Sequence, residues 1–272
     1  MDDRPFSTET TVFVTTIGDQ ANFDDCLAHL ECQTLGCRIE VIDHVAPMSA
    51  AFQQMYERCQ TPFYIQVDED MILFPEAVQE LEEKIRQAPP EVVLICAPLW
   101  DCDVEHTIQG LKIYRHSIVK QFPYEDAVGF EVAQVERLRA AGYSARMLPM
   151  DRANCLGEHG KHYTPRTIFL RWQKCLQKHL AKRPLPWVES YPQWLLKRYL
   201  ESRDPLHLYA LLGAVAGIAD PAAAQTGKDW RVPNEALERM LRYFPVTPES
   251  KVPGKVEEPK TIEPRMNTNE HE

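Results

Sequence analysis

The chain has 272 residues, of which 44% are hydrophobic and 26% are charged, and its formal net charge is −10. This size and composition are typical of a globular protein with a sizeable core, and the negative charge excludes nonspecific binding of nucleic acid by bulk electrostatics. No apolar run reaches the roughly 18 residues of a membrane span, and the acidic N-terminus lacks the basic-then-apolar order of a signal peptide. The eight cysteines form no CxxC pair, which favours reduced thiols and a cytoplasmic protein.

Predicted strands and helices alternate through the first third of the chain. The strands, read from β-branched and apolar runs, are 11–17, 38–42, 63–67 and 92–97, and the helices between them are 22–33, 49–59 and 76–87. Pro75 precedes the last of these helices, and proline favours a helix start. A strand–helix repeat of this kind predicts an α/β fold in which a mainly parallel sheet carries helices on both faces.

The remainder of the chain changes from mixed elements to helices. A strand or hairpin at 110–115, a helix at 131–141 and a short strand at 145–148 are followed by helices at 166–182, 191–202, 205–218 and 234–243. From about residue 245 the chain is poor in apolar residues, a composition typical of disorder. We therefore predict an α/β domain over 1–165, a helical C-terminal extension over 166–244 and a disordered tail over 245–272.

An acidic triplet, Asp68–Glu69–Asp70, directly follows the third predicted strand. Ligands bind beyond the carboxyl ends of the strands in such a sheet, and Thr15, Thr16 and Asp43 also lie at strand ends. Two acids separated by one residue can point into the same crevice and hold Mn²⁺ or Mg²⁺, whose charge helps a nucleoside diphosphate to leave. Alone, the triplet fits a solvated turn that caps the next helix equally well; its position after the third strand favours the metal site.

Two further groups could contribute chemistry at the same edge. Asp126 and Glu131 lie near the start of the helix 131–141, where a carboxylate could accept a proton from an acceptor hydroxyl. Acids at this position also commonly cap a helix N-terminus. His159 and His162 belong to a Gly- and Lys-containing loop, and a neutral imidazole is a good ligand for a divalent ion. Judged alone, such a loop is more often an exposed polar segment.

The order of these features resembles the inverting family 2 glycosyltransferases of the GT-A fold. The resemblance covers about residues 11–172 and rests on four segments: the first strand TVFVTTIG, the metal-type segment FYIQVDEDMILFPEAV, the acidic FPYEDAVGFE that leads into RLRAAGYSARMLP, and the histidine loop. The combination of VDED with RLRAAGY after an acidic pair is more specific than either segment alone. The resemblance implies a GT-A-like, nucleotide-sugar-binding α/β domain.

The resemblance also implies roles for the residues at strand ends. Asp68 and Asp70 would bind Mn²⁺ or Mg²⁺, with Asp70 as the more direct ligand, and the loop would supply His159 or His162 as a further ligand. The nucleotide of a UDP- or GDP-sugar would lie against Thr15, Thr16 and Asp68, and Asp43 would face its base.

The catalytic base has two candidates under this resemblance. Asp126 belongs to the literal Glu–Asp pair, whereas the spacing back from Arg137 selects Glu131. Either acid would deprotonate the acceptor hydroxyl for in-line attack at the anomeric carbon, with inversion.

Two departures from the family pattern narrow the expected activity. The second strand ends in Asp43–His44–Val45 rather than in Asp-Asp-Gly-Ser, so recognition of the nucleotide base is expected to differ. The Gln-x-x-Arg-Trp motif of processive relatives is incomplete, because Ile168 replaces its glutamine before Arg171–Trp172. The resemblance therefore implies nonprocessive transfer to a saccharide or another hydroxyl acceptor.

The segment 160–203 is basic in an otherwise acidic chain. It holds ten Lys or Arg against two acids, a local charge of +8, so the remainder carries −18. The helix 166–182 has one basic and one apolar face, which fits peripheral contact with the anionic inner face of a membrane or with a phosphorylated acceptor. A helix packed on the domain with solvated lysines fits the same pattern and is the commoner outcome.

Two other functions remain compatible with the sequence. A nucleotidyltransferase acting on sugar phosphates also places acids and Mg²⁺ at strand ends, although those that resemble pyrophosphorylases carry an early Gly-rich loop with a basic residue, and this chain has Gly18–Asp19–Gln20. A noncatalytic nucleotide-sugar-binding module would retain the fold without turnover. Neither G-x-G-x-x-G nor G-x-x-x-x-G-K-[ST] occurs, which disfavours a Rossmann dehydrogenase and a P-loop enzyme.

Overall fold

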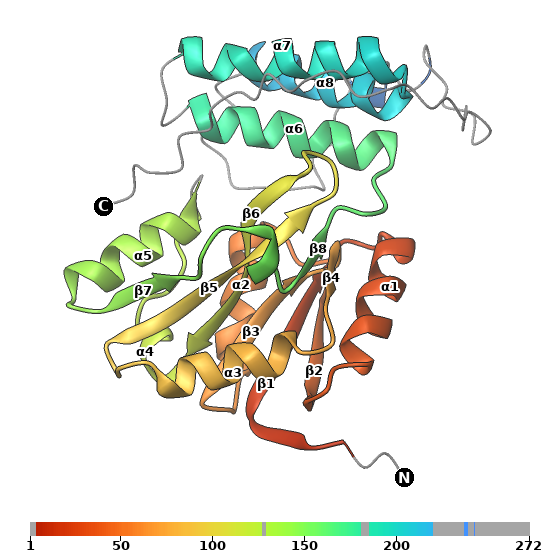
Figure 1. The fold of residues 1–272 in the computed structure, drawn as a ribbon. Coiled ribbons are helices and arrows are strands. Elements are labelled where there is room, and N and C mark those ends of the chain that lie inside the picture. The colour runs from red at the N-terminus through yellow and green to blue at the C-terminus, as the bar shows by residue number, and fades with distance from the viewer. Residues whose placement is uncertain (1–3, 127–128, 181–184, 220–236, 239–241, 243–272) are drawn as a thin grey trace.

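The computed structural model describes residues 4–126, 129–180, 185–219, 237–238 and 242. Within them an eight-stranded sheet has the order β2-β1-β3-β6-β5-β8-β4, and β7 pairs with β5 (Figure 1). The strands are β1 (Phe6–Thr16), β2 (Gly36–Asp43), β3 (Phe63–Asp68), β4 (Met71–Leu73), β5 (Val92–Asp101), β6 (His106–Arg115), β7 (Ser144–Met147) and β8 (Gly157–His159).

Most strands of this sheet run in one direction. β1 is parallel to β2 and β3, and β5 is parallel to β7 and β8. β6 is antiparallel to both β3 and β5, and β4 is antiparallel to β8. Among the described strands only β4 and β6 therefore run against the rest, which confirms the predicted α/β fold with a mainly parallel sheet.

Helices cover both faces of the sheet, because alternate strand residues point to opposite sides. On one face, α1 (Gln20–Glu31) and α3 (Ala77–Gln87) pack against side chains such as Val12, Val14 and Ile65. On the other face, α2 (Met48–Arg58), α4 (His116–Val119) and α5 (Phe130–Ala140) pack against Phe13 and Tyr64. Burial on both faces explains why residues 12–14 of β1 and 63–65 of β3 are uninterrupted hydrophobic runs.

The helical extension has an apolar cluster of its own. It consists of α6 (Pro165–Leu180), α7 (Leu185–Ser202) and α8 (Pro205–Ala219), which stack at one end of the α/β sheet (Figure 1). α6 buries Phe169, Trp172 and Leu176 in this cluster. The apolar face of α6 is thus packed inside the protein, which fits the interpretation of a packed helix with solvated lysines and gives no support to membrane contact.

Several elements differ from the sequence prediction. The strands β4 and β8 are three residues each, too short for a periodic pattern. β6 starts at His106 and forms a hairpin with β5, and α7 starts at Leu185 and contains Pro192. The predicted helix 234–243 lies mostly, and the tail 245–272 entirely, outside the described residues. No helix of the described parts has the length and apolarity that crossing a membrane requires.

Candidate active site

The acidic triplet lies where β3 ends and turns into β4. Asp68 is opposite Thr15 in the parallel register of β1 and β3, and Thr15 Oγ1 donates a 2.7 Å hydrogen bond to Asp68 Oδ1. Glu69 turns the other way: its backbone N–H donates to Thr15 O at 3.0 Å, and its buried carboxylate accepts hydrogen bonds from Thr16 Oγ1 and Ile17 N. Burial raises the pKa of Glu69. The middle acid therefore anchors the loop after β1, whereas the flanking aspartates face Thr15 and His159.

Asp70 and His159 are brought together by the short strands that the sequence did not predict. β4 pairs with β8 so that Met71 is opposite His159. Gly160, with a φ of 71°, donates its N–H to Asp70 O at 2.9 Å, a conformation that favours glycine. His159 Nε2 consequently lies 3.4 Å from Asp70 Oδ2.

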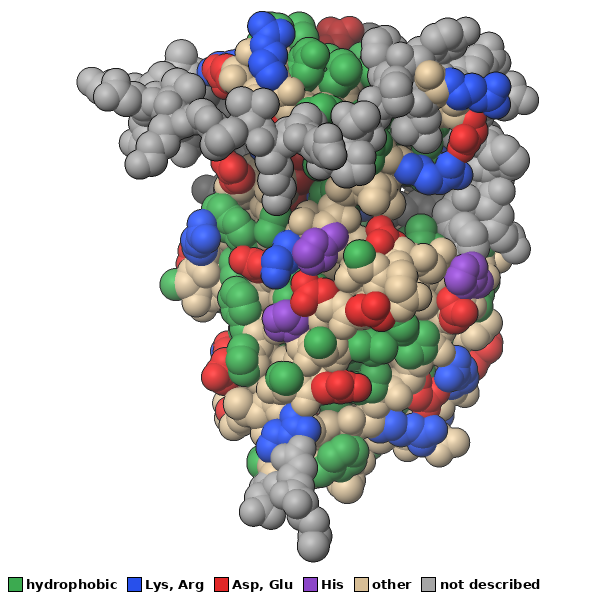
Figure 2. Space-filling model, turned by 90° about the vertical axis from the view of Figure 1, so that its right-hand side faces the viewer, with side chains coloured by type: hydrophobic (Ala, Val, Ile, Leu, Met, Phe, Trp, Pro, Cys, Tyr) green, Lys and Arg blue, Asp and Glu red, His purple; other side chains and the backbone are tan. Residues whose placement is uncertain are grey.

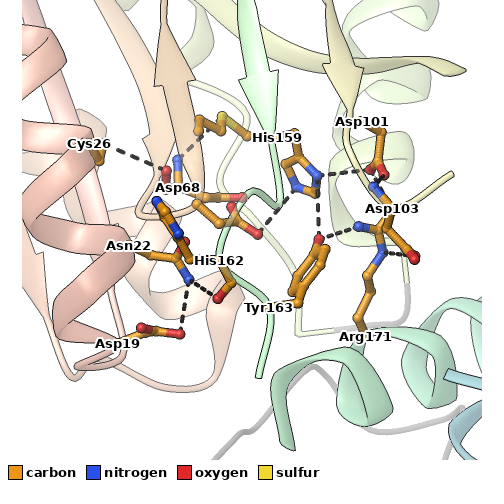
Figure 3. A network of polar contacts seen from close by, with 12 residues as sticks. Asp19, Asn22, Cys26, Asp68, Asp101, Asp103, His159, His162, Tyr163 and Arg171 are labelled. Atoms are coloured by element: carbon orange, nitrogen blue, oxygen red, sulfur yellow. Dashed lines mark hydrogen bonds and ion pairs between the residues drawn. The ribbon is translucent and has the colours of Figure 1, made fainter. Parts of the chain in front are cut away.

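A buried acid stands behind this histidine. Asp101, at the end of β5, is fully buried, and its Oδ2 lies 2.9 Å from His159 Nδ1. Arg171 of α6 donates hydrogen bonds to Asp101 and to the hydroxyl of Tyr163 (Figure 3). Burial alone would raise the pKa of Asp101, but the hydrogen bond from His159 and the charge of Arg171 hold it well below its usual value.

The pKa of His159 is raised as a result of its acidic neighbours. Burial opposes protonation of the imidazole, but the carboxylates of Asp70 and Asp101 outweigh this effect. An imidazole between two carboxylates is poised to carry a positive charge, or to exchange its proton for a metal ion.

Sequence reasoning missed Asp101, Tyr163 and the role of Arg171. The strand was predicted to end at Ala97, whereas β5 continues past an irregularity between Ala97 and Pro98 to Asp101. Pro98 concealed the continuation, because proline is uncommon within a sheet. Recognising that β5 continues would have placed Asp101 at a strand end, beside the other candidates.

His162 is held apart from Asp70 and His159. Its Nε2 lies 2.9 Å from Asp25 Oδ2 on α1, and its backbone carbonyl accepts a hydrogen bond from Asn22. The structure thus separates the two candidate histidines: His159 faces Asp70, and His162 faces α1. A metal-binding role for His162 stays a prediction with no contact to support it.

The two candidate bases lie on the sheet face that α5 covers. Ser49 Oγ donates a 3.1 Å hydrogen bond to Asp126 Oδ1, and Lys112 of β6 forms an ion pair with Glu131. Lys112 is opposite Gln66 in the register of β3 and β6. Because Gln66 and Asp68 are two residues apart in one strand, they point to the same face. Glu131 is therefore connected through Lys112 to the face that carries Asp68.

The predicted nucleotide residues border the same edge. Thr16 O accepts a 3.0 Å hydrogen bond from His44 N, which ties the ends of β1 and β2 together. The side chain of Asp43 is 62% exposed and is bonded to the ring of His44. Asp43 is thus accessible to a ligand, while Thr15 and Thr16 are engaged with the acidic triplet.

Asp70 and His159 supply some, but not all, of the ligands that a divalent ion requires. Carboxylate oxygen is the preferred ligand of Mn²⁺ and Mg²⁺, whereas imidazole nitrogen suits borderline transition-metal ions better. The distance of 3.4 Å between Asp70 Oδ2 and His159 Nε2 lets both reach one ion. In the described part of the chain no group of three or more His, Cys, Asp or Glu could hold an ion alone. Such a pair suits an ion that arrives with a diphosphate, because Mg²⁺ is usually bound by one or two carboxylates together with substrate phosphates.

A cavity of about 170 Å³ lies between the loop after β8 and the helices α7 and α8. It begins beside the residue that follows His159, and its lining includes Asp103, Gly160, Lys161, Tyr163, Arg198 and His207. Acidic, basic and histidine side chains gather below the helical extension on the face that Figure 2 shows.

Comparisons with known proteins find similarity to solved structures only. No protein-family model matches the chain, and no curated protein matches it. The mannosyltransferase PcManGT from Pyrobaculum calidifontis, in complex with GDP-Man and Mn²⁺, is 13% identical, with 88% of this chain and 79% of that chain covered and a TM-score of 0.48. TarS 1–349 of S. aureus, in complex with UDP, is 10% identical, with 83% and 98% covered and a TM-score of 0.41.

A nucleotidyltransferase-like structure also matches. The 4-diphosphocytidyl-2C-methyl-D-erythritol synthase from Anaerococcus prevotii is 7% identical, with 54% of this chain and 91% of that chain covered and a TM-score of 0.37. At these identities and scores the similarities assign no activity to the chain, so its function has to be argued from the site.

Proposed function

We propose that this protein is a metal-dependent, nonprocessive glycosyltransferase that moves a sugar from a UDP- or GDP-sugar to a hydroxyl acceptor with inversion. The observation that carries the proposal is the convergence of Asp70 and His159, 3.4 Å apart, beyond the strand end at which Thr15 holds Asp68. A carboxylate–imidazole pair at the carboxyl edge of an α/β sheet suits an ion that binds together with a diphosphate.

Each group of residues has a distinct task under this proposal. Asp70 and His159 would hold Mn²⁺ or Mg²⁺, which when bound neutralises the charge that develops on the departing nucleoside diphosphate. Asp68 would contact the ion and the nucleotide from the opposite side of the turn, and the exposed Asp43 would face the nucleotide base. His162 would join only if its bond to Asp25 were exchanged.

Either Asp126 or Glu131 would remove the proton from the acceptor hydroxyl. The ion pair with Lys112 fixes the direction of the Glu131 carboxylate. Asp126 accepts its hydrogen bond from the neutral hydroxyl of Ser49. Both acids remain candidates, and their amide variants distinguish them.

The cavity between the loop 160–163 and the helices α7 and α8 is our candidate for acceptor binding. It adjoins the end of β8, which carries His159, and it combines charged groups with the ring of Tyr163. Carboxylates, guanidinium groups and aromatic rings offer the hydrogen bonds and the flat apolar surface that a saccharide requires.

The nucleotidyltransferase alternative is less well supported by the site. Activation of a nucleoside triphosphate would suit a basic residue in the loop after β1, but here Thr16 and Ile17 of that region bind the acidic Glu69. The noncatalytic alternative is decided by turnover rather than by geometry.

The test uses the full-length protein with a panel of UDP- and GDP-sugars, with and without Mn²⁺. We expect release of UDP or GDP from one donor only when the ion is present, and a loss of at least about 100-fold in Asp70→Asn and His159→Asn. Asp24→Asn, an exposed aspartate on α1, is the matched control and should keep wild-type turnover. Full metal-dependent turnover in Asp70→Asn would refute the site, and donor binding without turnover would favour the noncatalytic module.

A further inference from the structure

A buried carboxylate that has no role in the proposed reaction lies directly behind His159. Asp101 is 0% exposed, and its Oδ2 is 2.9 Å from His159 Nδ1. The other ring nitrogen, Nε2, faces Asp70 Oδ2 at 3.4 Å. We infer that Asp101 is a positioning residue, which accepts a hydrogen bond from Nδ1–H of His159 and thereby presents the Nε2 lone pair to the ion beside Asp70. This inference rests on the proposed function, because it gives that ion site a supporting group.

The second oxygen of Asp101 shows why the carboxylate cannot simply be rotated. Asp101 Oδ1 accepts hydrogen bonds from the backbone N–H groups of Asp103 and Val104, both at 3.0 Å. Backbone amides can only donate, so Oδ1 is committed as an acceptor, and Oδ2 is the atom that meets the imidazole. Oδ2 of the ionised carboxylate can only accept a hydrogen bond, so the imidazole nitrogen that faces it must be the donor. In the neutral imidazole the hydrogen must therefore be on Nδ1, which leaves Nε2 free to bind an ion.

Arg171 links this arrangement to the helical extension. Its guanidinium group donates to Asp101 Oδ2 and to the hydroxyl of Tyr163, and it lies 4.9 Å from the centre of the Tyr163 ring. The charge of Arg171 favours the ionised form of the buried Asp101, and the planar group fixes the direction of the carboxylate. α6 therefore contributes to the geometry of the ion site without touching Asp70. Arg171 therefore affects the ion site indirectly, through its contact with Asp101.

The first test measures which nitrogen of His159 carries the hydrogen. In Asp101→Asn the side chain keeps its shape, and its single oxygen must still serve the backbone N–H groups of Asp103 and Val104. The new NH₂ group then faces the imidazole and donates to Nδ1, which moves the hydrogen to Nε2 and blocks the ion. We expect long-range ¹H–¹⁵N spectra of the metal-free, full-length protein at pH 8.5 to show Nδ1–H in the wild type and Nε2–H in the variant, with the signal assigned by its loss in His159→Asn.

The second test measures binding of Mn²⁺, with and without UDP or GDP, from the electron paramagnetic resonance signal of the free ion. An outer group of this kind typically changes metal affinity 10- to 100-fold, and we expect an increase in Kd of about that size in Asp101→Asn. Glu158→Gln is the matched control, because it removes a carboxylate from the residue that precedes His159 on β8, and its Kd should stay within about twofold. Arg171→Lys retains the charge but not the two-pronged contact, and its Kd should rise about tenfold.

The outcomes separate this inference from the proposed function. An Nε2–H tautomer in the wild type, or Asp101→Asn with an unchanged tautomer and unchanged Kd, would overturn the inference. Should Asp101→Asn fail to fold, the wild-type tautomer and Arg171→Lys decide, and a wild-type Kd in Arg171→Lys would count against it. Absence of Mn²⁺ binding by the wild type even with UDP or GDP present would instead refute the proposed ion site, whatever the tautomer.

Discussion

Thr15 Oγ1 donates a 2.7 Å hydrogen bond to Asp68 Oδ1 across the paired strands β1 and β3. The bond joins the end of one strand to the first acid of the triplet, so the direction of the Asp68 carboxylate is set by a neighbouring strand rather than by its own turn. A residue that was predicted to lie against a nucleotide therefore also orients the acid beside it.

Replacement of Thr15 by valine is expected to weaken donor-dependent turnover about 10- to 100-fold, because the loss of one hydrogen bond to a charged group is worth about 1.5–3 kcal/mol. Thr15→Ser keeps the hydroxyl and should stay near wild type. Initial rates with Mn²⁺ and the cognate nucleotide-sugar measure the effect. Equal rates for the valine and serine variants would show that this bond does not matter for turnover.

Glu69 predicts a pH dependence of stability. Its pKa is raised by burial, so the folded protein holds the proton more tightly than the unfolded chain does. Stability from this group is therefore fully present below the unfolded pKa near 4.5 and is lost as the pH rises through the higher folded pKa. Each unit of pKa difference corresponds to about 1.4 kcal/mol.

Glu69→Gln should remove this contribution while leaving an acceptor for Thr16. We expect the free energy of unfolding of the variant, relative to the wild type, to increase between about pH 4.5 and pH 7. Urea unfolding at several pH values measures it, with the exposed Asp24→Asn as the control. A constant difference across that range would contradict the raised pKa.

Replacement of the two candidate bases, Asp126 and Glu131, should affect stability differently. Asp126→Asn and Glu131→Gln should each be tested for transfer and for donor binding. The variant that lacks the catalytic base should have a kcat about 10²–10⁴-fold lower than the wild type and an unchanged affinity for the donor. Glu131→Gln should also lower thermal stability, because it leaves Lys112, whose side chain is 18% exposed, without its charged partner. If both variants transfer sugar at the wild-type rate, neither acid is the base.

Gly213 allows the helices α8 and α6 of the extension to pack closely. A Cβ atom there would lie 2.2 Å from Phe169 O, so α8 approaches the backbone of α6 only because this position is glycine. Gly213→Ala gains about 1 kcal/mol of helix propensity but forces the helices apart at a cost of about 1–3 kcal/mol. We expect a net loss of thermal stability, with Val215→Ala, at an exposed position of α8, as the control. A more stable Gly213→Ala would show that the helices can separate without loss.

The local pattern of the chain determined the elements that carry their own periodicity. β1, β2, β3 and the helices between them follow from runs of apolar residues, and the position of Asp68–Glu69–Asp70 at a strand end follows with them. The roles within the triplet did not follow: only the fold shows that Glu69 turns inward to Thr16 and Ile17.

Tertiary structure alone decided which distant residues meet at this edge. The pairing of β4 with β8 brings His159 to Asp70, whereas His162, three residues further along the chain, lies against Asp25. Asp101 and Arg171 are 70 residues apart and meet because α6 packs over the end of β5. Such contacts depend on which short strands pair and on how helices pack, and neither leaves a periodic signal in the residues themselves.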